Sequence, residues 1–557
     1  MKFSEWPYER ADIQKAEREL EQLMEDFRAA DSGEEQFEVH RRYYALEGRV
    51  RTQEVIARVR FDGDMTNAFY EKERQYYDEM MPGFRALQAK YQKLLYESPY
   101  RDELEKKISP ARFHAMELKF RANDERLIPL KKEENELTNR YMKLIAAARI
   151  PFDGRELNIS LLRPYMVNSD RQVRFAAHKA LAEYFDSVTG EIDEIYDGLV
   201  KNRTAQGRLL GYKNFTPLGY ERMGRAWYGQ KEVEQFRNEV KEWLVPFIGK
   251  LNEKKRKRLG LEKLSYVDEN VYLPQGDPAP VGTAEEILKA GQTLYRELSP
   301  ETGKFFDFML EHELFDVEGR KNKRSGGYMN YMPDYKAPVI FANFNGTSGD
   351  ADVITHECGH AFQGYVMRDE EVRELTENTM DCAEIHSMSM EFFTGKWMEL
   401  LFGDRAEEYR QVHLESFLQF IPYGCTVDEF QHIVYENPEM TPAGRKAAWA
   451  RLEKEYKPHL DYGEDSFFAE GGFWQKQHHI FGLPFYYIDY CLASVCALQF
   501  KVQMDEDFED AWSRYLKLCR LGAGLPYTEL LHAAGLKTPF EKGCVKELVE
   551  KLEQKLF

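Results

Sequence analysis

The chain has 557 residues, of which 43% are hydrophobic and 14% aromatic, so it can bury a large core. Its 77 basic and 96 acidic residues leave a formal net charge of −19. An acidic surface repels phosphate backbones, so we expect no nucleic-acid partner.

No segment of the sequence has the composition of a signal peptide or a membrane anchor. The first residues, from Met1 to Pro7, contain no apolar stretch, and no later segment is apolar for the length of a membrane span. The seven cysteines are an odd number and form no C-x-x-C pair, which is typical of reduced thiols. We therefore expect a cytoplasmic protein with no membrane partner.

Long charged helices are predicted for the first part of the chain. Acidic, basic and apolar residues recur there at helical spacing, and Gly33 and Pro99 mark breaks between segments. Such helices usually pack as antiparallel hairpins or as a bundle. The predicted helices span residues 13–29, 34–59, 65–96 and 129–146.

The character of the sequence changes near residue 165. Residues 150–170 contain turn signals and short strand-like runs, after which Ser169 or Asp170 can cap a new helix that starts at Arg171. We place a domain boundary here. The expected domains are an N-terminal helical domain at residues 1–165 and a second domain at residues 166–557.

Two short runs further along predict strands in a chain that is otherwise helical. They are residues 325–331 and residues 338–344. The fold class is therefore mainly α with a small β-sheet. Residues 338–344 could form an edge strand that pairs with an extended peptide, or a short core strand, and the residues favour neither.

Directly after the second run, His356-Glu357-Cys358-Gly359-His360 matches the pattern H-E-x-x-H. Residues four apart lie on one face of a helix, so both imidazoles can reach one tetrahedral metal ion. Glu357 is then angled towards the position where the ion holds water, and its carboxylate can take a proton from that water. The spacing predicts one Zn²⁺ per chain, with Glu357 as general base. Apolar neighbours argue against two ordinary surface histidines.

A catalytic zinc needs a third protein ligand. Val366 stands where one known pattern places a further histidine, so that pattern is excluded. A turn at residues 368–371 instead leads into a helix predicted over residues 380–402, which can return against the first.

One face of this second helix is acidic. Its acidic residues are Glu377, Asp381, Glu384 and Glu391. Glu384 lies a full turn into the helix among apolar residues, so we predict it as the third ligand. Asp381, one turn earlier, could orient a ligand imidazole. Glu370, Glu371 and Glu374 are expected to point outward from the turn.

Attack on a peptide carbonyl builds an oxyanion that needs a hydrogen-bond donor besides the metal. Residues 477–490 concentrate neutral donors, with two histidines and three tyrosines around Gly482 and Pro484. Tyr486 and Tyr490 lie one helical turn apart on the same face. The residues alone leave open whether this segment is catalytic or part of the core.

Together these motifs resemble the oligoendopeptidase F family of the thimet oligopeptidase superfamily. The resemblance covers nearly the whole chain. It includes the segment from Gly207 to Tyr212, the metal helix followed by Asp381-Cys382-Ala383-Glu384, and the C-terminal histidine and tyrosine segment.

The resemblance implies a two-lobed, mainly helical zincin-like peptidase with a deep channel that admits short unstructured peptides. It implies zinc ligands at His356, His360 and Glu384, and the general base at Glu357. It also implies that His479, Tyr486 and Tyr490 act on the oxyanion and substrate, with His478 and Tyr487 as alternatives one residue away.

The expected function is hydrolysis of internal bonds in short peptide substrates. A helical metallocarboxypeptidase is the first alternative, but we identify no cation that would hold the free carboxylate of its substrate. A non-enzymatic helical binding protein is the second, and the intact ligand and base pattern argues against it.

Overall fold

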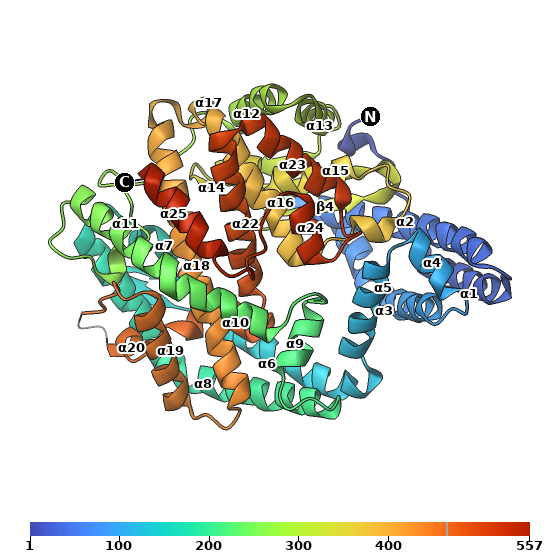
Figure 1. Cartoon of the computed structure of the whole chain (residues 1–557), viewed down its shortest axis with the longest axis horizontal. Coiled ribbons are helices and arrows are strands. Elements are labelled where there is room, and N and C mark those ends of the chain that lie inside the picture. Colours follow the sequence, from blue (N-terminus) through green and yellow to red (C-terminus); the bar gives the residue numbers. More distant parts are fainter. Residues whose placement is uncertain (464–465, 557) are drawn as a thin grey trace. The chain divides into compact units, whose positions relative to one another are not determined.

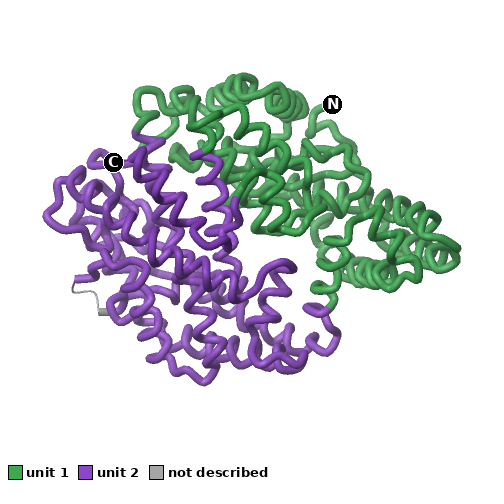
Figure 2. The backbone as a smooth tube through the Cα atoms, viewed as in Figure 1, with its two compact units in different colours: residues 1–120, 278–407, 503–536 green, residues 121–277, 408–502, 537–557 purple. Residues whose placement is uncertain are grey.

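The computed structural model describes residues 1–463 and 466–556, and it confirms a mainly helical fold with small sheets (Figure 1). The chain divides into two compact units, each assembled from three separate stretches of sequence (Figure 2). Unit 1 comprises Met1–Phe120, Pro278–Glu407 and Gln503–Leu536, and unit 2 comprises Arg121–Asp277, Glu408–Val502 and Lys537–Phe557. These units follow spatial contacts, and the domain boundary near residue 165 stays a prediction.

Unit 1 contains the larger sheet. Its strands are β3 (Phe315–Glu318), β4 (Tyr328–Met332) and β5 (Ala337–Phe344). The helices that lie wholly or mainly in unit 1 are α1 (Ile13–Ala29), α2 (Gly33–Gly63), α3 (Ala68–Tyr96), α4 (Arg101–Lys107), α5 (Pro110–Ala122), α12 (Ala284–Leu298), α13 (Pro300–Glu311), α14 (Gly349–Asp352), α15 (Cys358–Val366), α16 (Met380–Phe393), α17 (Glu399–Phe402), α23 (Phe508–Leu521) and α24 (Tyr527–Ala533).

Unit 2 contains an antiparallel pair of short strands, β1 (Ile150–Phe152) and β2 (Arg155–Leu157). The helices that lie wholly or mainly in unit 2 are α6 (Ile128–Ala146), α7 (Ile159–Met166), α8 (Arg171–Leu209), α9 (Thr216–Arg222), α10 (Gln230–Glu239), α11 (Val245–Arg258), α18 (Ala406–Glu436), α19 (Pro442–Tyr456), α20 (Ser466–Ala469), α21 (His478–Gly482), α22 (Tyr487–Glu506) and α25 (Cys544–Leu556).

The N-terminal helices form as their residue patterns predict. The side chain of Asp12 accepts a hydrogen bond from the Lys15 N–H and begins α1, and Ser32 caps α2 in the same way. Apolar residues at helical spacing, including Leu20 and Phe27, are fully buried where α1, α2 and α3 pack side by side (Figure 1, blue). The four predicted helices are confirmed, and α4 and α5 are additional elements.

The sheet of unit 1 has the strand order β3-β5-β4. The central strand β5 pairs in parallel with β3 and antiparallel with β4. Residues 338–344 therefore form a core strand, and the hypothesis of an edge strand at this position is wrong. The reason is that β3, only four residues long, covers the side of β5 that would have been free. In the part of the chain that the structure describes, the two outer strands of this sheet, β3 and β4, each have a strand partner on one side only.

A buried arginine ties the long helix α8 to the C-terminal part of unit 2. The guanidinium of Arg203 donates to Glu134 on α6 at 2.7 Å, to the Tyr435 hydroxyl at 2.9 Å and to the Ile480 carbonyl on α21 at 3.1 Å. Against the effect of burial, Arg203 and Arg222 lower the pKa of Glu134 to about 2. The start of the segment at residues 477–490 is thus anchored by paired charges.

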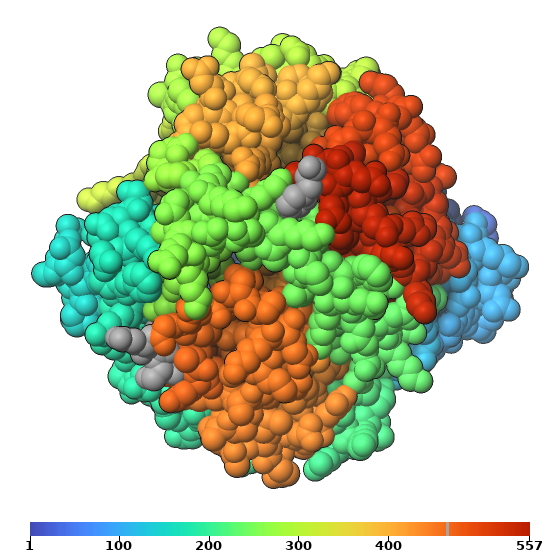
Figure 3. All heavy atoms as spheres, turned by 60° about the vertical axis from the view of Figure 1, so that its left-hand side comes forward, coloured from blue at the N-terminus to red at the C-terminus, as the bar shows by residue number. Residues whose placement is uncertain are grey.

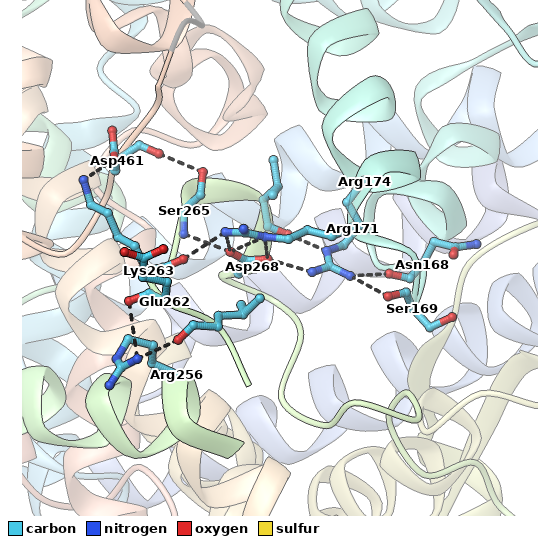
Figure 4. Close-up of polar contacts among 12 residues, drawn as sticks. Asn168, Ser169, Arg171, Arg174, Arg256, Glu262, Lys263, Ser265, Asp268 and Asp461 are labelled. Atoms are coloured by element: carbon cyan, nitrogen blue, oxygen red, sulfur yellow. Dashed lines mark hydrogen bonds and ion pairs between the residues drawn. The ribbon is translucent and has the colours of Figure 1, made fainter. Parts of the chain in front are cut away.

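A second charge cluster in unit 2 holds the N-terminus of α8 (Figure 4). Asp268 accepts hydrogen bonds from Arg171 at 2.6 Å, from Arg174 at 2.7 Å and from the Ser265 N–H at 2.9 Å. Figure 4 shows both guanidinium groups directed at this one carboxylate. Because Asp268 and Arg174 are buried, each charge requires the other as its partner.

The C-terminal helix α25 packs against α10 and the π-helical turn that follows it (Val240–Leu244). In Figure 3 the red C-terminal residues lie beside the green residues around position 240. The carboxylate of Glu239 accepts hydrogen bonds from the backbone N–H groups of Gly543 and Val545. A carboxylate at a helix N-terminus satisfies unpaired N–H groups, so Glu239 fixes the start of α25.

Two expectations about the environment of the chain can be compared with the structure. All seven cysteines are free and buried, which agrees with reduced thiols. Among the residues described, no helix combines the length and the apolar character that crossing a bilayer requires.

Candidate metal centre

The H-E-x-x-H motif lies in unit 1 on one continuous helical segment. This segment consists of α14, a π-helical turn (Val353–Glu357) and α15. Asp350 fixes its beginning, because its carboxylate accepts hydrogen bonds from the N–H groups of Asn345 and Gly346 at 2.9 and 2.8 Å. A turn precedes this segment, with Gly346 at a φ of +78°. The π-helical turn carries the first histidine and the glutamate of the motif, and such turns are frequent at functional sites.

The two histidines of the motif meet Glu384 on α16. The Nε2 atom of His356 lies 3.4 Å from Glu384 Oε2, and the Nε2 atom of His360 lies 3.8 Å from the same oxygen. One ligand atom from each of the three residues lies within 4.8 Å of the others. Two imidazole nitrogens and one carboxylate oxygen are the protein donors typical of a catalytic zinc, so these residues fit such an ion.

A glycine allows the two helices to approach closely enough for this cluster. A Cβ atom at Gly359 would lie 2.6 Å from the Ser387 Cα and 2.8 Å from the His386 carbonyl oxygen. Both neighbours are backbone atoms of α16, which cannot move aside as a flexible side chain can. The absence of a side chain at Gly359 therefore sets the distance between α15 and α16, and with it the position of Glu384.

Glu391 orients the first histidine. His356 Nδ1 lies 2.7 Å from Glu391 Oε1, so the other ring nitrogen, Nε2, faces Glu384. Although burial opposes the charged form, hydrogen bonds to Glu384 and Glu391 raise the pKa of His356 well above its usual value. A carboxylate that accepts from the outer nitrogen of a ligand histidine fixes the ring and its tautomer. The sequence predicted Glu391 on the acidic face of the helix, but it did not predict that Glu391 orients His356.

Glu357 is half-buried beside the ligand cluster. Burial raises the pKa of its carboxyl group, the nearby charge of His356 opposes this shift, and Glu384 adds to it. A carboxylate with a raised pKa is a better proton acceptor than one in water.

The other acidic residues of this region have structural partners. Asp381 is buried and accepts a hydrogen bond from the Cys382 N–H at 2.8 Å. Glu374 accepts a hydrogen bond from the Tyr44 hydroxyl, and its carboxylate lies 2.9 Å from His40 Nε2. The expectation that Glu374 points outward is therefore wrong, because its partners on α2 lie some 330 residues earlier in the sequence.

The C-terminal histidine and tyrosine segment belongs to unit 2. Within it, the hydroxyl groups of Tyr486 and Tyr490 lie 2.7 Å apart, and the ring of His479 lies 5.6 Å from that of Tyr486. Tyr487 also lies near His479, at 4.9 Å between ring centroids, whereas the neighbouring His478 is exposed. The structure thus brings His479, Tyr486 and Tyr490 together in one cluster.

A strained residue sets the direction of this cluster. Phe485 is fully buried and has a φ of +67°, a conformation that side chains other than glycine rarely adopt. Its N–H donates to Gln431 Oε1 at 2.9 Å, and its carbonyl accepts from Arg225, which also donates to Asp489 at 2.6 Å. Polar contacts on both sides of Phe485 therefore fix the turn from which Tyr486 and α22 continue.

Comparisons with known proteins agree on one family. Residues 3–123 match the model of the Peptidase M3 N-terminal domain, and residues 303–550 match the model of Peptidase family M3. A search of curated proteins finds the chromosomal oligoendopeptidase F of Lactococcus lactis subsp. cremoris, 21% identical over 308 residues. That match covers 52% of this chain, and it spans about half the length of the relative, 48%.

Solved structures match over the full length of the chain. The structure of PZ peptidase A with inhibitor 2 is 45% identical, covers 100% of this chain and 99% of its own, and superimposes with a TM-score of 0.89. A Bacillus anthracis str. Ames protein provisionally named oligoendopeptidase F is 40% identical, with coverage of 100% and 98% and a TM-score of 0.85. The resemblance stated from the sequence motifs is confirmed.

The role of Gly359 can be tested by adding one methyl group. We expect Gly359→Ala to push α15 and α16 apart, and so to lower both the melting temperature and the affinity for zinc. Gly364→Ala is the matched control on the same helix, because a Cβ atom there meets the Tyr331 ring at an ordinary 3.4 Å. Calorimetry and zinc titration against a chelator measure the two effects. Equal behaviour of the two variants would contradict the proposed spacing role.

The role of Glu391 can be tested separately from folding. Glu391→Ala leaves His356 without its outer hydrogen bond, so we expect zinc affinity to fall by about 10–100-fold. Glu391→Gln retains an acceptor and should restore part of that affinity. Glu377→Gln, which alters an exposed pair with Arg112, is the control and should bind zinc normally. Unchanged affinity in Glu391→Ala would show that Glu391 does not orient the ligand.

Proposed function

Since this chain belongs to peptidase family M3, we propose that it is a zinc-dependent endopeptidase that cleaves internal bonds of short, unstructured peptides. One observation carries the proposal. Ligand atoms of His356, His360 and Glu384 gather within 4.8 Å of one another, next to the half-buried carboxylate of Glu357. All seven cysteines are free, which suits the reducing cytoplasm expected for the chain.

The three ligands and Glu391 form the metal-binding part of the proposed site. His356 and His360 supply neutral imidazole nitrogens, and Glu384 supplies a carboxylate oxygen. A bound zinc ion supplies Lewis-acid activation of water and of the substrate carbonyl. Ser387 donates a hydrogen bond to Glu384 Oε2 at 3.2 Å and so helps to orient this carboxylate.

Glu357 is the proposed general base. It takes the proton of the attacking water and then delivers it to the nitrogen of the departing amine, so that the peptide C–N bond breaks with the proton balance conserved. Its raised pKa supports this role, because the proton must be taken up and released near neutral pH.

His479, Tyr486 and Tyr490 are the proposed donors to the oxyanion and the substrate. The family resemblance supports this assignment, and so does their grouping in one cluster. Burial and the charge of His478 lower the pKa of His479 to about 4, so at neutral pH its ring can donate a hydrogen bond without carrying charge. The exposure of His478 supports His479 as the histidine of the pair that acts.

The strand β4 is the proposed docking edge for the peptide backbone. β4 has a strand partner on one side only among the residues described, and an extended peptide can add to such an edge through main-chain hydrogen bonds. Tyr331 on β4 packs near Gly364 of the metal-bearing helix α15. Backbone pairing makes few demands on side chains, so we propose broad sequence specificity.

Two variants should separate metal binding from chemistry. Glu357→Gln removes a base but no ligand, so we expect normal zinc content and loss of nearly all turnover. Glu384→Ala removes a ligand, so we expect the zinc content itself to fall. Metal analysis by mass spectrometry, together with kcat on a fluorogenic peptide, measures both. The opposite pattern in the two variants would show that the roles are exchanged.

Peptides with both ends blocked test the endopeptidase assignment. We expect internal cleavage of flexible peptides of roughly five to twenty residues, because ordering a longer chain costs more conformational entropy. A folded protein should resist, while its reduced and unfolded form should be cut. Failure on every blocked peptide, with cleavage of free C-termini, would indicate a metallocarboxypeptidase instead. Rapid cleavage of the folded protein would contradict a confined site.

A further inference from the structure

The buried side chain of Gln477 contacts one of the two ring nitrogens of His479, Nδ1. Gln477 Nε2 lies 2.6 Å from His479 Nδ1, and Gln477 Oε1 lies 2.5 Å from the Tyr423 hydroxyl on α18. The backbone of Gln477 is also held, because its N–H donates to the Trp474 carbonyl at 2.9 Å and its carbonyl accepts from the Ile480 N–H at 3.0 Å. All of these residues lie in unit 2.

The donors and acceptors around Gln477 determine which way its side-chain amide faces. If its oxygen accepts from the Tyr423 hydroxyl, its NH₂ group must face His479. If the amide were turned over, its NH₂ group would donate to the Tyr423 hydroxyl oxygen. The hydroxyl proton of Tyr423 would then need another acceptor. The structure gives the Tyr423 hydroxyl no second hydrogen-bond partner among the described residues. Because an unpaired buried polar group is costly, the first arrangement is favoured.

The orientation of the amide then decides where His479 carries its proton. An NH₂ group only donates, so the Nδ1 atom that faces it must be an acceptor and cannot carry hydrogen. A neutral imidazole has one proton, which must therefore sit on Nε2. We infer that Gln477, oriented by Tyr423, is a positioning residue that fixes His479 as the Nε2–H tautomer and makes its free nitrogen a hydrogen-bond donor.

Two further observations agree with this inference. Burial keeps the ring neutral at pH 7, and only a neutral imidazole has tautomers to select. The His479 ring also stacks on Tyr486 at an interplanar angle of 25°, so its plane is held as well as its proton. The catalytic value of the tautomer rests on the proposed function, in which His479 donates to the oxyanion. The assignment of the tautomer itself does not rest on the proposed function.

Nitrogen NMR of the full chain labelled with ¹⁵N-histidine tests the tautomer directly. The signals of His479 are identified by their loss in His479→Gln. At pH 7 we expect an unprotonated Nδ1 and a protonated Nε2. Tyr423→Phe removes the group that orients the amide, so a population with the proton on Nδ1 should appear. Tyr184→Phe makes the same chemical change at a tyrosine of unit 2 whose hydroxyl donates to the Leu144 carbonyl and not to Gln477, so it should leave the spectrum unchanged. A protonated Nδ1 in the wild-type chain would overturn the inference.

The pH profile of Gln477→Glu provides a readout that a purely structural role would not change. A carboxylate at this position accepts from Nδ1–H and raises the pKa of His479. Below that pKa the imidazolium still donates from Nε2, but above it the proton stays on Nδ1 and Nε2 has none. We expect kcat of the variant to fall on the order of 10²-fold as pH rises through the new pKa, as for one lost oxyanion donor.

The two measurements separate the inference from the proposed function. An Nε2–H tautomer in the wild type, combined with a Gln477→Glu profile identical to that of the wild type, would overturn the role of His479 and leave the tautomer assignment standing. An Nδ1–H tautomer in the wild type would overturn the assignment, whatever the activity. Circular dichroism of each variant confirms that the compared proteins are folded.

Discussion

The contact between α15 and α16 is the constraint on which the candidate metal centre depends. The H-E-x-x-H spacing places two imidazoles on one helical segment, but the proposed third ligand, Glu384, comes from another helix and reaches them only through tertiary packing. Helix axes approach most closely where small residues face each other. Gly359 opposite Ser387 provides such a place, because a methyl group at Gly359 would collide with the backbone of α16. The position of Glu384 is therefore a consequence of a missing side chain.

The same contact gathers ionisable groups that would be costly to bury one by one. Glu357, Glu384 and Glu391 contribute three carboxylates, and His356 and His360 contribute two imidazoles. Buried charges persist when they are paired and hydrogen-bonded. Glu391 is paired with His356, and Glu384 faces both imidazoles and accepts from Ser387. The arrangement is thus stabilised by contacts within unit 1, and a divalent cation fits its excess of negative charge.

Sequence reasoning identified the parts of this site that depend on local order. The helix α1 follows from the helical spacing of its apolar residues, and the grouping of His356, His360 and Glu384 follows from helical spacing and apolar surroundings. Sequence reasoning failed where the environment of a residue depends on a partner far away in the sequence. Glu374 looks like a solvent-exposed turn residue until α2 supplies His40 and Tyr44. Residues 338–344 look equally suited to an edge or a core until the short strand β3 covers them.

Glu391 illustrates the same limit over a shorter distance in the sequence. The spacing groups it with Glu377 on one acidic face, but α16 begins at Met380, so Glu377 lies before this helix. The structure separates them, because Glu377 pairs with Arg112, whereas Glu391 contacts His356, a proposed metal ligand. Periodicity predicts which residues share a face, but only the packing of a second element decides which of them acquires a chemical role.

Unit 2 fixes its proposed donors by a different physical means. The proposed metal ligands lie on helical segments, with His356 in the π-helical turn. Tyr486 instead follows a residue in the left-handed region, and a strained non-glycine residue costs about 1–3 kcal/mol. That cost is offset by buried polar contacts, since Gln431 and Arg225 bind the two peptide groups of Phe485 and Asp489 holds the arginine. Gly219 contributes by leaving room for the Phe485 ring, which a Cβ atom there would approach to 2.5 Å. The direction of Tyr486 and Tyr490 thus depends on residues that look in sequence like ordinary core.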